Sequence, residues 1–390
     1  MKILITSDWY LPAVNGVVTS VKNLRRELEA RGHEVRVLTL SQNRHSCRKD
    51  GVTCLGSVAA GLIYPGARLR TALAGKWVRE IVEWGPDVVH SQCEFSTFFL
   101  ARRIAEELDI PLVHTYHTVY EDYTHYFSPN VRFGKKAAAV FTRWAASHTD
   151  CLIAPTAKVR MLLQGYGVRK PVFVVPSGID LRHFQQEPDP LQSAVLRVSL
   201  DIPQDRTVLV FVGRLAEEKR VDELLRFRAD LGPGGVTLLL VGDGPDRKRL
   251  EDVSAGLGLS APDVVFAGMV PAEQVADWYQ LGDLFVSAST SETQGLTYAE
   301  ALAAGVPVLC RADPCLLGVV RDGENGWQYH SEAEFRQRLE EFLAHPQYRE
   351  SLARSARATG EEYSAQRFAE RVEAIYLEQM ERGALRRIPA

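Results

Sequence analysis

Two glutamates separated by seven residues bracket the stretch of sequence with the clearest potential for chemistry. Ser289–Glu300 contains Glu292, follows the apolar segment 283–287 and leads into an alanine-rich segment. This order predicts a strand, a polar loop and a helix start, whose backbone N–H groups favour a phosphate. Carboxylates beside a phosphate are suited to accept hydrogen bonds from sugar hydroxyls. The stretch therefore indicates a nucleotide-sugar site, although an ordinary strand–helix turn with solvated glutamates explains the pair alone equally well.

A cationic loop follows a second predicted strand, 207–213. Gly213 allows the backbone to approach a ligand, and Arg214 and Lys219 supply two positive charges from one loop. Arginine binds phosphate in bidentate fashion and lysine acts as a point charge, so both can stabilise charge on a departing diphosphate. Taken alone, a basic pair after a strand is more often a surface loop.

The two stretches together resemble signatures of glycosyltransferase family 4, whose members are retaining enzymes with the GT-B fold. Glu292 and Glu300 match its Glu-x7-Glu arrangement, and Ser-Glu-Thr-Gln-Gly-Leu-Thr at 291–297 looks like its glycolipid-synthesising members. The run 213–219 resembles the family's Gly-Arg-Leu-x-x-x-Lys diphosphate grip. The resemblance implies catalytic roles for Arg214, Lys219, Glu292 and His117. It implies donor-binding roles for Gly16, Gly213, Gly242, Gly268, Met269, Gly295, Leu296, Thr297 and Glu300.

Two further turns have weaker signals of their own. Gly242–Pro245 has Gly-x-Gly without a third glycine, and the family usually places this turn beside the nucleotide pocket. Val265–Val270 stands where family members hold the base through backbone groups. Asn15–Gly16 follows the first predicted strand and begins a predicted helix, although many relatives have Gly-Gly at this position. Neither half contains the full glycine fingerprint of a dinucleotide oxidoreductase.

The loop after the predicted strand 112–115 contains two histidines and an acidic pair. A metal site lacks a third and fourth ligand at a standard spacing, so no metal is expected. By resemblance, His117 matches the histidine beside the transferred sugar, and Tyr-Glu-Asp-Tyr at 120–123 is similar to bacterial diacylglycerol glucosyltransferases. Glu121, Asp122 and Tyr123 are therefore expected to bind the acceptor. For His114, packing in the core or a capping role is the default interpretation.

Residues 132–144 form the best candidate for a membrane-binding helix. At about 100° per residue, one arc is apolar and aromatic and its neighbour is basic, which suits an anionic bilayer surface. The apolar arc contains Phe133, Ala137, Val140, Phe141 and Trp144. The predicted membrane-binding residues are Arg132, Lys135, Lys136, Arg143 and Trp144. The alternative is that Phe141 and Trp144 pack into the core.

Composition limits the class of protein. The chain has 390 residues, of which 46% are apolar and 24% charged, so disorder is not expected. Its six cysteines show no zinc spacing and indicate reduced thiols in the cytosol.

No apolar run approaches the length of a spanning helix, and Met1–Asp8 indicates a buried strand rather than a signal peptide. Residues 1–180 carry 23 Lys and Arg against 16 Asp and Glu, which favours an anionic partner surface, with uneven solvation charge as the alternative.

Alternating strands and helices must position these groups. The pattern predicts strands over 35–40, 88–90, 112–115, 207–213, 236–241, 264–267, 284–287 and 306–310, and helices over 69–84 and 96–108. The pattern predicts an α/β protein with two Rossmann-like, doubly wound domains, in which ligands bind at the carboxyl ends of the parallel strands. We expect an acceptor- and membrane-binding domain over 1–175 and a nucleotide-sugar-binding domain over 176–364. The resemblance implies a cleft between them and a terminal helix, 365–390, that packs back on the first domain.

The sequence therefore predicts a retaining transferase that moves a hexose to a lipid such as diacylglycerol, with glucose from UDP-glucose as the expected donor. No cofactor or essential metal is expected. The expected partners are a nucleotide sugar, a lipid acceptor and an anionic membrane surface, with no nucleic acid, and the expected location is the cytoplasmic face of the membrane. The alternatives are another lipid or a soluble or polysaccharide acceptor, or a sugar-nucleotide epimerase of the same shape.

Overall fold

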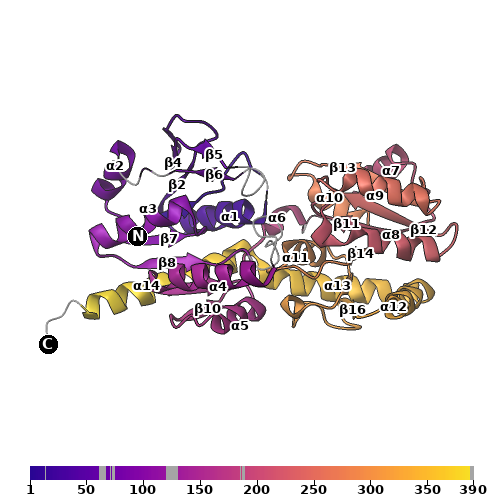
Figure 1. Ribbon diagram of the computed structural model, residues 1–390. Coiled ribbons are helices and arrows are strands. Elements are labelled where there is room, and N and C mark those ends of the chain that lie inside the picture. Colours follow the sequence, from indigo (N-terminus) through magenta and orange to yellow (C-terminus); the bar gives the residue numbers. More distant parts are fainter. Residues whose placement is uncertain are drawn as a thin grey trace. The chain divides into compact units, whose positions relative to one another are not determined.

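The computed structural model describes residues 1–13, 15–60, 67–70, 72, 75–119, 131–184, 186 and 189–386. The chain forms two compact units (Figure 1). Unit 1 is Met1–Gly178 together with the segment that begins at Ala365, and unit 2 is Ile179–Ser364. Each unit is built on a largely parallel sheet with helices packed on it, as the sequence predicts for a pair of doubly wound domains.

In unit 1, the described strands form a sheet in the order β10-β9-β8-β7-β1-β2-β4-β3, parallel except for the β3–β4 pair. Ile3 of β1 pairs with Val35 of β2 on one side and with Val88 of β7 on the other, so chain order reverses at β1. In such sheets, ligands bind at the carboxyl ends of the strands where the order reverses. The strands are β1 (Lys2–Ser7), β2 (Glu34–Leu40), β3 (Cys47–Lys49), β4 (Val52–Leu55), β7 (Val88–Ser91), β8 (Leu112–Thr115), β9 (Cys151–Ala154) and β10 (Val172–Val174).

Helices cover both faces of this sheet. Ile3 and Ile5 of β1 pack in one apolar cluster and Leu4 packs in another, because successive side chains point to opposite faces. The Asn15 side chain caps the first helix by accepting a hydrogen bond from the Val18 N–H at 3.0 Å. The described helices of the unit are α1 (Gly16–Ala30), α2 (Lys76–Trp84), α3 (Ser96–Leu108), α4 (Val131–Ser147), α5 (Ala157–Gly165) and α14 (Ala365–Arg386).

Helix α14 completes unit 1 although it comes last in the chain. It lies against α1 (Figure 1), and Phe368, Val372 and Tyr376 join the apolar cluster of β1. Arg31, one residue beyond α1, pairs with Glu373 at 2.5 Å. The terminal helix therefore packs on the first domain, as the fold prediction requires.

In unit 2, the described strands form a parallel sheet in the order β13-β12-β11-β14-β15-β16. Chain order reverses between β11 and β14, so the loops after these two strands meet at one edge. The strands are β11 (Thr207–Val212), β12 (Val236–Val241), β13 (Val264–Gly268), β14 (Leu284–Ser287), β15 (Val308–Arg311) and β16 (Gly326–Tyr329). The described α-helices are α6 (Leu181–Phe184), α7 (Pro190–Ser199), α8 (Val221–Asp230), α9 (Arg247–Gly256), α10 (Val275–Gln280), α11 (Leu296–Ala303), α12 (Glu332–Ala344) and α13 (Arg349–Gly360).

One predicted helix begins later in the chain than the sequence pattern indicates. A helix was expected over 69–84, but α2 begins only at Lys76, after Gly75 with φ +146°. The short strands β5 (Val58–Ala59) and β6 (Arg68–Leu69) instead pair antiparallel, which keeps Leu69 extended. The units divide between residues 178 and 179, whereas the sequence placed the boundary between 175 and 176.

Candidate active site

The cationic loop after β11 contacts the glutamate loop after β14. Arg214 Nη2 lies 2.5 Å from Glu218 Oε1, and Lys219 Nζ lies 2.5 Å from Glu292 Oε1. Ser291 Oγ also donates to the Glu218 carbonyl at 3.5 Å. The structure thus gathers three of the predicted catalytic residues at the edge where chain order reverses. Each cation is held by a carboxylate, so a diphosphate would compete with these carboxylates for the same donors.

Glu218 was not singled out from the sequence. Its spacing of four residues from Arg214 could have indicated the pair, since side chains at this spacing are neighbours in a helical turn. The segment Glu217–Lys219 does form one turn of 3₁₀ helix. This turn aims Lys219 toward Glu292 while Glu218 reaches back to Arg214.

Helix α11 starts at the predicted glycine. Gly295 is its N-cap with φ +72° and provides no side-chain cap, so no cap side chain occupies the backbone N–H groups at the start of the helix. A Cβ on Gly295 would lie 2.4 Å from Tyr298 Cδ2, which excludes larger residues there. Tyr298 in turn donates its hydroxyl proton to Ser287 Oγ at 2.8 Å and ties the helix to the end of β14.

Glu300 is oriented by a tyrosine from another helix. The buried Tyr279 of α10 donates its hydroxyl proton to Glu300 Oε2 at 2.8 Å. Burial raises the pKa of the Glu300 carboxyl, and the Tyr279 hydrogen bond partly opposes this rise. Oε1 has no hydrogen-bond partner among the described residues, so it can accept from a ligand hydroxyl. Tyr279 has no sequence pattern that marks it, because its contact with Glu300 depends on how α10 packs on α11.

The predicted glycines of three neighbouring loops meet at this edge. The Gly242 N–H donates to the Gly268 carbonyl at 2.8 Å, and the Gly213 N–H donates to the Val241 carbonyl at 2.9 Å. A Cβ on Gly242, whose φ is +134°, would lie 2.0 Å from the Gly213 oxygen. Close contact between backbones therefore explains the glycine at position 242 of the Gly-x-Gly turn. Met269, which follows Gly268, is 70% exposed.

In unit 1, the predicted His117 lies two residues beyond β8 and is partly exposed. Its Nε2 lies 2.7 Å from Gln92 Oε1. Burial, with a smaller effect of His114, lowers the pKa of His117 to about 3, so its imidazole is neutral at physiological pH. The other first-domain donor residue, Gly16, is the first residue of α1. The predicted acceptor-binding residues Glu121, Asp122 and Tyr123 lie outside the described residues.

A buried polar cluster beside His117 was missed from the sequence. Asp8 Oδ1 accepts the Thr97 N–H at 2.9 Å at the start of α3, and Glu94 Oε1 lies 3.2 Å from His114 Nε2. Burial, reinforced by the charge of Glu94, raises the pKa of Asp8 to about 7. Several buried polar atoms here have no hydrogen-bond partner within the described part of the chain: Thr6 Oγ1, Asp8 Oδ2, Gln92 Nε2 and His114 Nδ1. Sequence reasoning used Ser7–Asp8 only to mark the end of a strand.

Helix α4 presents an apolar surface beside exposed basic residues. Phe133 is 69% and Val140 55% exposed, and together with Phe141 and Trp144 they line a hollow of about 510 Å³. Arg132, Lys135 and Lys136 are exposed on the neighbouring arc. We call these seven residues the α4 patch. The described residues include no helix that is long and apolar enough to cross a membrane.

Two predicted members of the membrane surface also have partners inside the protein. Trp144 is partly buried against the core residue Phe98, with ring centroids 6.0 Å apart, so the core alternative holds in part for this side chain. Arg143 donates from Nη1 to the Tyr166 carbonyl at 3.4 Å. Phe95 is 41% exposed and stacks on the ring of Phe141, a contribution from another segment that the helical pattern of α4 could not reveal.

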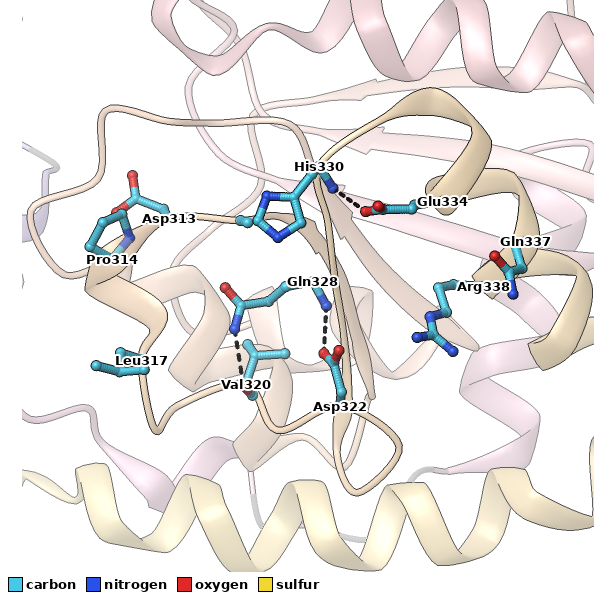
Figure 2. A pocket seen from close by; sticks show the side chains of 11 residues that line it. Asp313, Pro314, Leu317, Val320, Asp322, Gln328, His330, Glu334, Gln337 and Arg338 are labelled. Atoms are coloured by element: carbon cyan, nitrogen blue, oxygen red, sulfur yellow. Dashed lines mark hydrogen bonds between the residues drawn. The ribbon is translucent and has the colours of Figure 1, made fainter.

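A separate hollow of about 900 Å³ lies among the loop after β15, β16 and α12 (Figure 2). Its polar groups bind one another: the His330 N–H donates to Glu334 Oε2 at 2.6 Å, and the Gln328 N–H donates to Asp322 Oδ1 at 2.9 Å. None of the predicted site residues lines it, and none of its lining residues has a buried unpartnered side-chain atom. These hydrogen bonds connect the end of β16 to α12 and to the loop that precedes β16.

Comparison with known proteins identifies the family. Residues 14–183 match the profile described as Glycosyltransferase Family 4, and residues 193–359 match Glycosyl transferases group 1. The chain is 33% identical over 383 residues to the alpha-monoglucosyldiacylglycerol synthase of Streptococcus pneumoniae, covering 97% of this chain and 86% of that protein. It is 32% identical over 395 residues to the synthase of the same description from Acholeplasma laidlawii, covering 98% of each.

Solved structures show the fold. The sucrose-phosphate synthase from Thermosynechococcus elongatus has a TM-score of 0.75 at 21% identity, covering 97% of this chain and 98% of that one. Anabaena HepE in complex with UDP and glucose has a TM-score of 0.74 at 18% identity, covering 97% and 100%. The chain belongs to glycosyltransferase family 4 and has the GT-B fold that its sequence predicts.

Proposed function

We propose that the chain transfers glucose from UDP-glucose to a hydroxyl group of diacylglycerol and retains the anomeric configuration. The observation that carries this proposal is the similarity, over nearly the full length, to two alpha-monoglucosyldiacylglycerol synthases. Family membership supports the transferase chemistry, and the descriptions of these relatives support a glucosyl group and a diacylglycerol acceptor.

The donor contacts in this proposal come from unit 2. Glu292 and the backbone over 295–297 hold the sugar and the diphosphate, and Oε1 of Glu300 accepts a hydrogen bond from the ribose. Arg214 and Lys219 exchange their carboxylate partners for the diphosphate and neutralise its growing charge. Such preorganised charges often supply the largest share of a rate enhancement.

In the reaction, the bond between the sugar C1 and the diphosphate oxygen breaks, and a bond forms between C1 and the acceptor oxygen on the same face. The acceptor proton passes to the departing diphosphate, so no protein base is required. By the family resemblance, we also propose that His117 contacts the transferred sugar and that Gly16 gives the first-domain loop access to the phosphates. We propose that Arg214 and Lys219 supply the charge neutralisation without a resident metal or other cofactor.

The acceptor reaches the enzyme at a membrane surface in this proposal. The α4 patch combines exposed apolar side chains with three cations, which an anionic bilayer surface would attract. The enzyme would then associate peripherally with the cytoplasmic face of the membrane.

Incubation of the protein with UDP-glucose tests the proposal. Release of UDP should depend on diacylglycerol in anionic liposomes, and the product should have the α configuration by its anomeric proton coupling. Interconversion of the sugar nucleotide without acceptor would support the epimerase alternative. Transfer to a soluble sugar or polyol at an equal rate would contradict the lipid acceptor while leaving the transferase chemistry intact.

A further inference from the structure

The hydrogen bond between Gln92 and His117 determines which ring nitrogen of His117 carries the proton. Gln92 directly follows β7, is 1% exposed, and its N–H donates to the Thr6 carbonyl at 2.8 Å. The sheet therefore holds its backbone, and Oε1 faces His117 Nε2 at 2.7 Å. A carbonyl oxygen can only accept a hydrogen bond, so Nε2 of His117 must carry the proton.

The opposite ring nitrogen is then a free acceptor. A neutral imidazole protonated at Nε2 has a lone pair at Nδ1, and Nδ1 of His117 has no hydrogen-bond partner among the described residues. His117 is partly exposed whereas Gln92 is buried, so a ligand can approach His117 and cannot approach Gln92. The amide thus lies behind the histidine and faces away from any substrate.

We infer that Gln92 is a positioning residue that holds His117 in the Nε2–H tautomer and presents Nδ1 as a hydrogen-bond acceptor to a substrate hydroxyl. The inference rests on the proposed function for the presence of such a substrate, but the tautomer is a property of the protein alone. Among the described residues, the titratable groups around this pair are His90 on β7, His114 on β8, and the carboxyl groups of Asp8 and Glu94.

NMR spectroscopy of the histidine-labelled enzyme tests the tautomer directly. The chain has 10 histidines, and the signal of His117 is assigned by its loss in His117→Gln. We expect nitrogen shifts of the Nε2–H form in the wild type, and loss of this fixed tautomer in Gln92→Met, which removes the acceptor at similar volume. An Nδ1–H form in the wild type would overturn the inference.

Activity supplies a second readout. Gln92→Met should lower kcat about tenfold or more with little change in the KM for UDP-glucose, by analogy with the roughly 10- to 100-fold losses seen when the hydrogen-bond partner of a metal-ligating histidine is removed. Gln92→Glu keeps an acceptor oxygen but adds a negative charge, which should raise the pKa of His117 by about 1–3 units. This variant should therefore retain more activity than Gln92→Met at alkaline pH and lose it as the pH falls through the raised value.

A matched control is available on α14. Gln379 is also buried, and its Nε2 is also unpartnered. Gln379→Glu introduces the same carboxylate on α14 rather than at the hydrogen-bond partner of His117, and it should leave both the tautomer and the shape of the pH profile unchanged. An equal acid sensitivity in both glutamate variants would overturn the inference. If the wild type shows the Nε2–H tautomer but no transfer to diacylglycerol, the proposed function fails and the structural assignment stands.

Discussion

At the scale of single residues, the buried carboxyl of Glu300 should make the proposed donor binding depend on pH, and the hydrogen bond from Tyr279 should set the pH at which binding weakens. Burial raises the pKa of Glu300. As the pH falls through this raised pKa, the carboxylate gains a proton and becomes a weaker acceptor, so affinity for UDP-glucose should fall. Tyr279→Phe removes a hydrogen bond that lowers the pKa, and the loss of affinity should therefore begin at a higher pH than in the wild type. Calorimetric titration with UDP-glucose across the acidic range measures this shift.

The role of Glu300 itself is tested by removing the carboxylate. Glu300→Ala should weaken donor binding about 10- to 100-fold, because a hydrogen bond to a charged group contributes about 1.5–3 kcal/mol. Glu340→Ala, at an exposed position of α12, removes the same charge elsewhere and should leave affinity unchanged. Equal donor affinity in Glu300→Ala and the wild type would refute the ribose contact.

Asp8 should make folding stability depend on pH. Its pKa is about 7 in the folded chain against 3.8 for the free side chain, so between these values the folded state binds a proton that the unfolded state lacks. Stability then falls as the pH rises through this window, by up to about 4 kcal/mol for roughly three pKa units. Asp8→Asn should unfold at a higher temperature than the wild type at pH 8. The advantage should shrink as the pH falls toward 4, and Asp50→Asn at an exposed turn should show no such trend.

The residues found from the sequence and those missed differ in one physical respect. Arg214, Lys219, Glu292 and Gly295 belong to short stretches in which strand, loop and helix start follow one another, so the local pattern together with the family resemblance singled them out. Tyr279 and Gln92 act through partners on other elements, 21 and 25 residues away. Neither spacing has a local signature, and only the packed fold brings these pairs together.

At the scale of elements, the α4 patch has exposed lysines that lie outside the apolar core. Lys135 and Lys136 are exposed, so replacing both by serine should leave folding intact while vesicle binding weakens by about 1 kcal/mol for each lost cation. Flotation with anionic vesicles measures the loss. Lys22→Ser with Lys49→Ser removes the same charge from exposed positions on α1 and β3 and serves as the control. Equal flotation of the two double variants would contradict a membrane role for α4.

The buried strands were the most predictable elements. Leu112–Thr115, Val236–Val241 and Leu284–Ser287 were placed at their observed bounds because strands covered on both faces are continuous apolar runs. Short strands at the edges of sheets were harder to predict. Cys47–Lys49 and Arg68–Leu69 are short and polar, and their strand conformation depends on pairing with a neighbour rather than on their own pattern. The same pairing explains why the helix predicted from residue 69 starts seven residues later.

At the scale of the whole molecule, the first unit depends on the last helix. Residues 1–178 lack one side of their apolar cluster until α14 is present, because Phe368, Val372, Ile375 and Tyr376 pack with Ile3 and Ile5. The Tyr376 hydroxyl also lies 2.6 Å from Nδ1 of the buried His90. Unit 2, in contrast, is one continuous segment, Ile179–Ser364.

This asymmetry predicts how the two units respond to changes in α14. Ile375 is 5% exposed and Leu377 on the same helix is 47% exposed. Ile375→Ala should destabilise unit 1 by about 2–5 kcal/mol, whereas Leu377→Ala should cost less than about 0.5 kcal/mol.

Removal of the chain from Ala365 onward should abolish the thermal unfolding transition of unit 1 and leave that of unit 2, as followed by calorimetry together with limited proteolysis. Survival of both transitions would show that unit 1 completes its core without α14, and loss of both would show that unit 2 is not independent.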